Sequence, residues 1–163
     1  MMTGKVLSTL IERHAAALVL YARQFTPHAD DVVQEAFIEL AAARKELEDP
    51  LPWLFRVVRN KAVSCARSDG RRQRRHLQVA QTRPEWFVTS AEHDEELQQV
   101  QVALQRLPQE LREVVVAHLW GGLSFDRIAP LIGISAPTCW RRYQEAIQLI
   151  REQLGEPCKT QND

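Results

Sequence analysis

Apolar residues in the first half of the chain recur at every third or fourth position, which is the spacing of one face of an α-helix. This pattern predicts three helices. The first covers 5–25, the second covers about 30–44, and the third runs from Trp53 to about Arg67. All three are amphipathic, so we expect them to pack against one another through their apolar faces.

Proline and glycine positions predict where these helices end. Thr26-Pro27 is expected to end the first helix and to cap the second, with Pro27 at the first helical position. Residues 49–52 are expected to form a turn before the third helix. Asp69-Gly70 is expected to break or bend the third helix.

The second half of the chain begins after a stretch that shows no period. Residues 77–92 have no sustained pattern and contain Pro84, which is typical of a linker. Helical spacing resumes at Leu97, Pro108 opens a further helix that ends at Gly121-Gly122, and two shorter helices follow. No alternating strand pattern of useful length occurs. We therefore expect an all-α fold of two small helical domains joined by a linker, with domains over 5–76 and 96–154, a linker over 77–95 and a tail over 155–163.

The last two predicted helices have the features of a helix-turn-helix. Ser124 and Ser135 are expected to cap them, Gly133 supplies the tight turn between them, and Cys139 falls where their crossing needs a buried apolar residue. On a helical wheel, Trp140 falls on the core side. The alternative is an ordinary helical hairpin whose arginines are solvated. If the second helix enters a DNA major groove, the contacting residues are expected to be Ser135, Thr138, Arg141, Arg142 and Glu145.

The net charge of zero conceals two segments of opposite charge. The chain has 21 Lys and Arg against 21 Asp and Glu, but residues 56–76 hold eight basic residues and one acid. Residues 84–96 hold five acids and no Lys or Arg. A basic segment of this density is typical of a protein that binds a phosphate backbone, and the alternative is a solvated basic loop.

The exposed faces of the second and third helices carry different chemistry. Opposite the apolar stripe of the second helix, an isoleucine lies among acidic and amide residues, which suggests a protein contact: Asp31, Gln34, Glu35, Ile38 and Glu39. The third helix presents basic residues with an amide and an aromatic residue, a combination suited to unstacked DNA: Trp53, Arg56, Arg59, Asn60 and Arg67. Trp53 is equally compatible with core packing.

Several functional classes are not expected. The longest apolar run, Ala15 to Ala22, is eight residues and too short to cross a bilayer, so we expect no membrane insertion. The three cysteines are widely spaced and form no CxxC motif, which argues against a disulfide scaffold or zinc finger and favours a cytoplasmic protein. The five histidines show no metal-ligand spacing, and no glycine-rich phosphate loop occurs. We expect no cofactor, no metal site and no enzymatic activity.

Three motifs together resemble a known family. Residues 30–40, DDVVQEAFIEL, and residues 52–60, PWLFRVVRN, are similar to region 2 of bacterial sigma factors of the extracytoplasmic-function group. Residues 107–142 are similar to region 4 of the same group. The resemblance covers most of residues 5–154 in the expected order, without the region that lies between these two in larger sigma factors.

The resemblance implies a role for each face. It implies that Asp31, Gln34, Glu35, Ile38 and Glu39 dock on core RNA polymerase. It implies that the −10 promoter element is melted and recognised by Trp53, Arg56, Arg59, Asn60, Arg67, Arg71, Arg72, Arg74 and Arg75. It also implies that the −35 element is read by the helix that carries Thr138, Arg141 and Arg142. An anti-sigma factor is a possible partner, although no residue of the chain identifies one.

Two functions therefore compete. The first is a sigma factor that binds core RNA polymerase and directs promoter-specific initiation. The second is a helix-turn-helix regulator that acts without polymerase, with the N-terminal lobe as a sensor or dimerisation module. The acidic face around Ile38 favours the sigma factor, because a simple regulator has no need of it.

Overall fold

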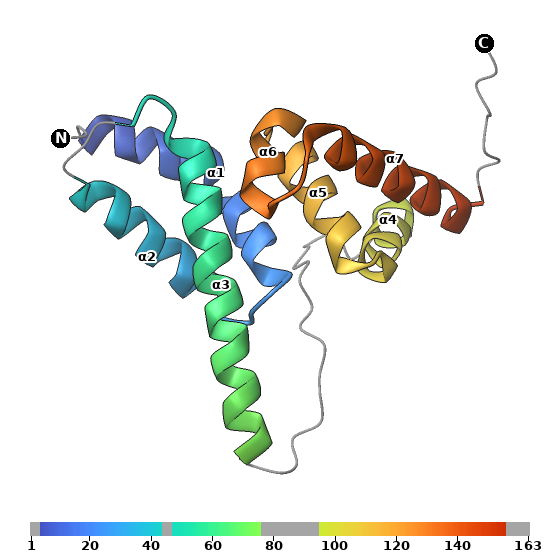
Figure 1. Cartoon of the computed structure of the whole chain (residues 1–163), viewed down its shortest axis with the longest axis horizontal. Helices are drawn as coiled ribbons and strands as arrows, with labels where there is room; N and C mark the ends of the chain where they lie inside the picture. The colour runs from blue at the N-terminus through green and yellow to red at the C-terminus, as the bar shows by residue number, and fades with distance from the viewer. Residues whose placement is uncertain (1–3, 44–46, 76–94, 156–163) are drawn as a thin grey trace. The chain divides into compact units, whose positions relative to one another are not determined.

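The computed structural model describes residues 4–43, 47–75 and 95–155. Within these ranges the chain forms seven α-helices and no β-strand (Figure 1). The helices fall into two compact units, one made of α1–α3 and the other of α4–α7. The expected all-α fold of two small helical domains is confirmed, and each unit is described separately below.

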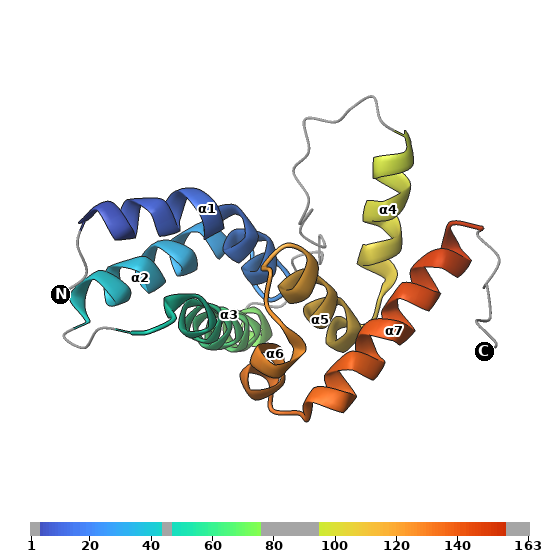
Figure 2. The same cartoon turned by 90° about the horizontal axis from the view of Figure 1, so that it is seen from above.

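The first unit is a bundle of three helices: α1 (Gly4–Arg23), α2 (Ala29–Ala42) and α3 (Pro50–Arg75). Figure 2 shows α1 and α2 side by side with α3 seen nearly end-on. Tyr21 and Phe55 are fully buried and meet edge to face, with ring centroids 5.0 Å apart. Leu18, Leu40 and Leu54 are buried around them. The aromatic pair adds to the free energy gained by apolar burial and fixes α1 against α3.

The start of α2 differs from the expectation. Thr26 does not cap the helix, and Pro27 is not its first residue, because α2 begins at Ala29 with His28 at the cap position. Thr26 is buried, and its hydroxyl oxygen accepts a hydrogen bond from the His28 backbone N–H at 3.2 Å. The threonine thus stabilises the turn that precedes the helix, as Ser and Thr hydroxyls often do.

The bounds of α3 also correct the sequence prediction. The helix begins at Pro50 rather than Trp53, and it continues without a break through Asp69-Gly70 to Arg75. Proline fits at the start of α3 because the backbone N–H groups of the first turn have no partner within the helix. One of them, the Leu51 N–H, donates a hydrogen bond to the Asp49 carboxylate at 3.2 Å. A single glycine within a helix costs only about 1 kcal/mol relative to alanine, which is too little to end one.

The second unit consists of α4 (Glu95–Arg106), α5 (Gln109–Leu119), α6 (Phe125–Ile132) and α7 (Ala136–Gln153). The long helix α7 packs against the three others. Leu104, Val114, Ile128 and Cys139 are buried at these contacts. At the same core, His118 stacks on Phe125 with centroids 4.4 Å apart and meets the Tyr143 ring at 5.0 Å, which joins α5, α6 and α7.

Helices α6 and α7 form the expected helix-turn-helix. Gly133 has φ +76°, a left-handed conformation that L side chains rarely adopt, and it makes the turn between the helices. Ser135 caps α7, since its side chain accepts a hydrogen bond from the Thr138 N–H. Ser124 stands at the cap position of α6 but makes no capping hydrogen bond through its side chain.

Two glycine-to-alanine substitutions should change stability in opposite directions. Gly133→Ala should lower the free energy of unfolding by about 1–2 kcal/mol, because the backbone there is left-handed. Gly70→Ala should raise it by about 0.5–1 kcal/mol, since Gly70 is helical and no atom lies within 4 Å of an added Cβ. Urea unfolding followed by circular dichroism measures both. A more stable Gly133→Ala protein would contradict the assigned turn.

The predicted linker and tail lie almost entirely outside the described residues, as does the Trp86-Phe87 pair. The expected boundaries of the two domains therefore remain predictions. No helix in the described ranges combines the length and the apolarity that crossing a membrane requires.

Candidate functional site

The exposed side of α2 carries the five residues predicted to contact a protein: Asp31, Gln34, Glu35, Ile38 and Glu39. We call this set the acidic face. All five are exposed, and Ile38 has 59% of its surface accessible. The opposite side of the helix buries Val33, Ala36 and Phe37 against the bundle, as the sequence predicted. The structure thus leaves one large aliphatic side chain uncovered among carboxylates.

Lys61 of α3 reaches the edge of the acidic face, a contact that the sequence analysis missed. Its Nζ lies 3.0 Å from Glu35 Oε2 and 2.8 Å from Glu39 Oε1. Hydrogen bonds to Glu39 and Glu35 raise the pKa of Lys61. The ammonium group therefore stays charged across the physiological pH range. The sequence shows only that Lys61 is a lysine within the basic segment. Its partners on α2 follow from tertiary packing, which the sequence pattern does not give.

The middle of α3 presents part of the predicted DNA-binding set to solvent. Arg56, Asn60 and Arg67 are exposed. Trp53 is half-buried, so it is neither a full core residue nor a ring fully free to stack on a base. Arg59 is also half-buried, and its guanidinium carbon lies 5.9 Å from the centre of the Phe25 ring. This cation–π contact draws Arg59 toward the bundle.

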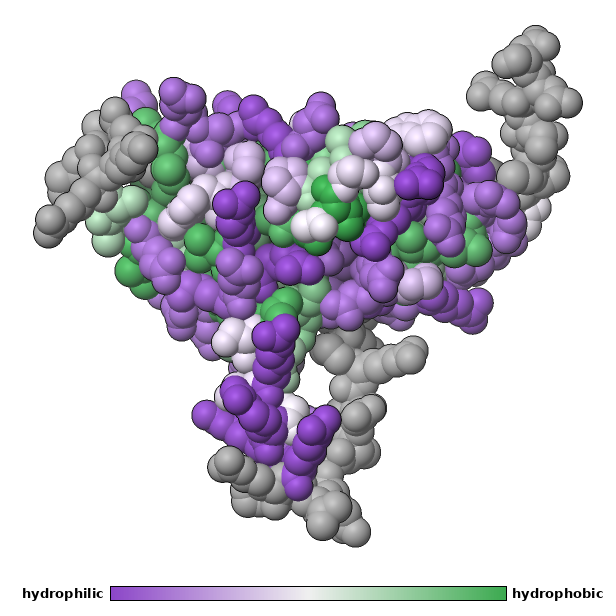
Figure 3. Space-filling model, in the orientation of Figure 1, coloured by the Kyte–Doolittle hydropathy of each residue, from purple (hydrophilic) through white to green (hydrophobic). Residues whose placement is uncertain are grey.

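The C-terminal end of α3 carries the densest positive charge. Arg71, Arg72 and Arg74 are exposed there, while the side chain of Arg75 lies outside the described residues. This part of α3 extends beyond α1 and α2 (Figure 1), and its surface is strongly hydrophilic (Figure 3). Because α3 is continuous, these arginines lie on the same rigid helix as Arg56 and Asn60 rather than on a loop.

The start of α7 holds Arg141 in a hydrogen-bonded network. The Ser135 hydroxyl donates to Thr138 Oγ1 at 2.9 Å, and Arg141 Nη2 donates to the same oxygen at 3.0 Å. Arg141 is exposed, so its guanidinium retains donors for a ligand while one N–H is held by Thr138. Three of the residues predicted to contact DNA are thus brought together. Glu145 is exposed one turn further along the helix.

Arg142 and Trp140 differ from their expected positions. Arg142 Nη2 lies 3.5 Å from Glu110 Oε2 of α5, and only 28% of its side chain is exposed, so it does not project fully from the reading side of α7. Trp140 was expected in the core, but 51% of its surface is exposed. The buried residues of α7 are the small Cys139 and Ala146, so the helix packs closely on its neighbours there and the large indole lies outside that contact.

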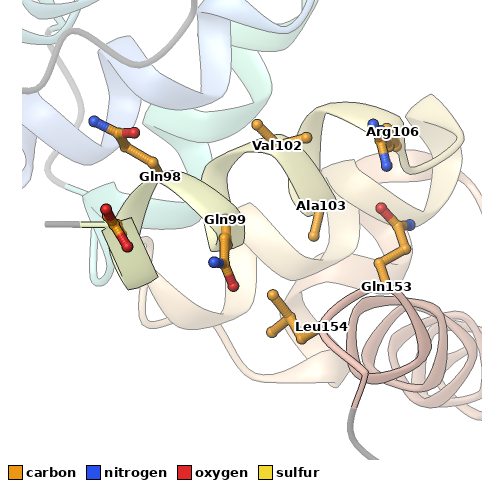
Figure 4. Close-up of a pocket in the computed structure, with 8 residues that line it drawn as sticks. Gln98, Gln99, Val102, Ala103, Arg106, Gln153 and Leu154 are labelled. Carbon is orange, nitrogen blue, oxygen red and sulfur yellow. The ribbon is translucent and has the colours of Figure 1, made fainter.

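Within the described ranges, neither a metal-binding cluster nor the pocket between α4 and α7 adds to the predicted site. No group of three or more His, Cys, Asp or Glu side chains in these ranges is placed to hold a metal ion. A pocket lies between α4 and the end of α7, where Val102, Ala103 and Leu154 meet several glutamines (Figure 4). None of the residues predicted as a site lines it.

Two family models match the chain. Sigma-70 region 2 matches residues 10–72, which make up most of the first unit, and Sigma-70 region 4 matches residues 97–150 in the second unit. The chain belongs to the sigma-70 family, in the extracytoplasmic-function group. This sigma factor directs transcription initiation by core RNA polymerase at promoter DNA. The match to region 2 as well as region 4 does not favour a regulator that works without polymerase.

Curated relatives agree with this assignment. The sigma factor is 31% identical over 152 residues to RNA polymerase sigma factor NccH of Alcaligenes xylosoxydans xylosoxydans, covering 84% of this chain and 80% of that protein. It is 29% identical over 136 residues to RNA polymerase sigma factor CarQ of Myxococcus xanthus, covering 78% of this chain and 75% of CarQ.

Solved structures show the same fold. The sigma factor RpoE, in complex with the anti-sigma factor NepR from Bartonella quintana, matches with a TM-score of 0.72 and 23% identity, over 94% of this chain and 98% of that one. CnrH, in complex with the cytosolic domain of CnrY, matches with a TM-score of 0.62 and 26% identity, over 94% of this chain and 90% of that one. At its lower identity, the likeness to RpoE is one of fold alone.

Proposed function

We propose that the sigma factor binds core RNA polymerase through the acidic face of α2. The observation that supports this most directly is Ile38, an exposed aliphatic side chain between Glu35 and Glu39. An apolar centre surrounded by charged residues is the usual organisation of a protein interface. The complementary surface on polymerase would be basic with an apolar pocket. Gel filtration of the purified chain with core polymerase tests this, and co-elution is the expected result.

The exposed side of α3 is our proposed contact with the −10 region of the promoter. Arg56, Asn60 and Arg67 lie along the middle of the helix, and Arg71, Arg72 and Arg74 follow at its end. Guanidinium groups along one helix can follow a phosphate backbone, and an amide can bond to a base edge. Trp53 is half-buried, so it offers only part of its ring for stacking on an unpaired base. Arg59 and Arg75 are included in the proposed −10 contact on the basis of the sequence pattern alone.

Helix α7 is our proposed recognition helix for the −35 region. Its cap residue and first three turns carry the residues proposed to contact DNA: Ser135, Thr138, Arg141, Arg142 and Glu145. Arg141 is exposed and oriented by Thr138, which suits a bidentate contact with guanine. Arg142, held partly by Glu110, is better suited to positioning or to a phosphate contact. We add Trp140 to this surface, because its exposed indole can pack on a sugar or on a thymine methyl group.

The finer assignments are also ours. The chain is proposed to act in the cytoplasm, to catalyse no reaction of its own, and to use residues 5–76 and 96–154 as its two domains, with the linker over 77–95. An anti-sigma factor is proposed as a regulatory partner, since two of the matched structures, RpoE and CnrH, are complexes with NepR, an anti-sigma factor, and with the cytosolic domain of CnrY.

Neutralising the end of α3 should weaken DNA binding in a salt-dependent way. In the triple variant Arg71→Gln, Arg72→Gln, Arg74→Gln, the slope of log K against log salt for single-stranded DNA should become less negative by about 2, because each phosphate contact contributes about 0.7. Fluorescence anisotropy at several salt concentrations measures this slope. Arg13→Gln, an exposed arginine of α1, is the control and should leave it unchanged. An unaltered slope in the triple variant would exclude these arginines from the DNA contact.

A further inference from the structure

Lys61 links α2 and α3 of the first unit at the edge of the acidic face. It comes from α3, 26 positions away in sequence from Glu35, and it bonds one carboxylate oxygen of Glu35 and one of Glu39. Only 27% of the lysine side chain is exposed, against 61% for Glu35 and 50% for Glu39. The lysine side chain is therefore partly buried at the junction of α2 and α3, while both carboxylates still face solvent.

Without Lys61, the two glutamates would not hold one arrangement. Glu35 and Glu39 are four residues apart on α2, so their like charges face each other and repel. Exposed glutamate side chains also lose rotamer freedom when a partner binds them, which weakens binding. A single ammonium group at 3.0 Å and 2.8 Å offsets this repulsion and holds both carboxylates at a shared contact beside Ile38 before any partner arrives.

We propose that Lys61 is a positioning residue of the polymerase-docking surface. By clamping Glu35 and Glu39, it presents them, next to the exposed Ile38, in one preformed arrangement to a basic partner surface. This inference rests on the proposed docking role of the acidic face. The inference concerns the conformation in which the two glutamate side chains are held, and not the charge of the face. Lys61 itself makes the net charge of the face less negative.

The test compares Lys61→Met with Lys61→Arg in the full chain, using the dissociation constant for core RNA polymerase. Methionine keeps an unbranched side chain without the charge, and arginine keeps the charge with extra donors. We expect Lys61→Met to weaken binding about fivefold, and Lys61→Arg to retain most of the affinity. Unchanged or tighter binding by Lys61→Met would overturn the proposal, since that result identifies Lys61 as a competitor of polymerase.

The same substitution in a Glu35→Gln, Glu39→Gln background separates positioning from stability. There Lys61→Met should have no further effect on affinity, because the lysine has no carboxylates to position. An equal loss of affinity in that background would mean that Lys61 acts by stabilising the helix bundle and not by positioning the glutamates. If the double glutamine variant itself binds polymerase normally, the docking role of the acidic face fails. If it binds poorly while Lys61→Met binds normally, only the role of Lys61 fails.

Discussion

Replacing Asp31 and Glu35 together by arginine is expected to weaken the binding of this sigma factor to core RNA polymerase by about 100-fold. Both residues are exposed on the acidic face, so the change reverses the sign of the surface around Ile38 without entering the core. Charge reversal removes two attractive contacts and places like charges opposite each other in the complex. Titration of labelled sigma factor with core polymerase, at fixed ionic strength, measures the change.

A control variant with the same change in net charge separates the acidic face from general electrostatics. Glu12→Arg with Glu152→Arg reverses two exposed acids on α1 and α7, outside the acidic face. This variant should bind polymerase within about threefold of the unaltered protein, because long-range attraction is screened by salt. Equal losses in the two variants would mean that α2 contributes only overall charge.

Replacing Arg141 by alanine should relax the sequence preference of the holoenzyme at one position of the upstream promoter element. A bidentate arginine–guanine contact discriminates by about 1–3 kcal/mol, which corresponds to about 5–150-fold in affinity. Arg141 is the exposed arginine whose guanidinium is already oriented by Thr138. Selection of bound sequences from a duplex library that is randomised in this element, using holoenzyme with either sigma factor, gives the preference at each position.

Two further variants make this result interpretable. Arg141→Lys should not restore the preference, because an ammonium group cannot form the paired contact. Arg151→Ala removes an exposed arginine from the last turn of α7 and should leave all preferences unchanged. If Arg141→Ala weakens binding equally for every sequence, Arg141 contacts phosphate and does not read a base.

The sequence predicted the helices and their buried faces well because one strong pattern decides them. Val33, Ala36 and Phe37 repeat at helical spacing, and all three are buried on α2. The helix ends were less predictable, because alternative end positions differ in free energy by about 1 kcal/mol or less. Gly70 was expected to break α3, but the cost of one glycine is smaller than the gain from continuing the helix.

The candidate site was predictable where it depended on exposure along one helix. It was not predictable where it depended on contacts between helices. Exposure of the acidic face follows from the helical period, whereas the bonds from Lys61 to Glu35 and Glu39 join residues far apart in sequence. The pairing of Arg142 with Glu110 is of the same kind. Trp140 was misplaced because a helical wheel gives a direction but not the space available.

Reconstitution with core RNA polymerase, followed by mapping of transcript starts on genomic DNA, tests the central claim most directly. Core polymerase with this sigma factor should initiate at a limited set of positions that share upstream and downstream sequence elements. The Asp31→Arg, Glu35→Arg variant should lose these starts at the same concentration. The account is contradicted if the starts match those of core polymerase alone, or if the chain selects the same DNA sites equally well without polymerase.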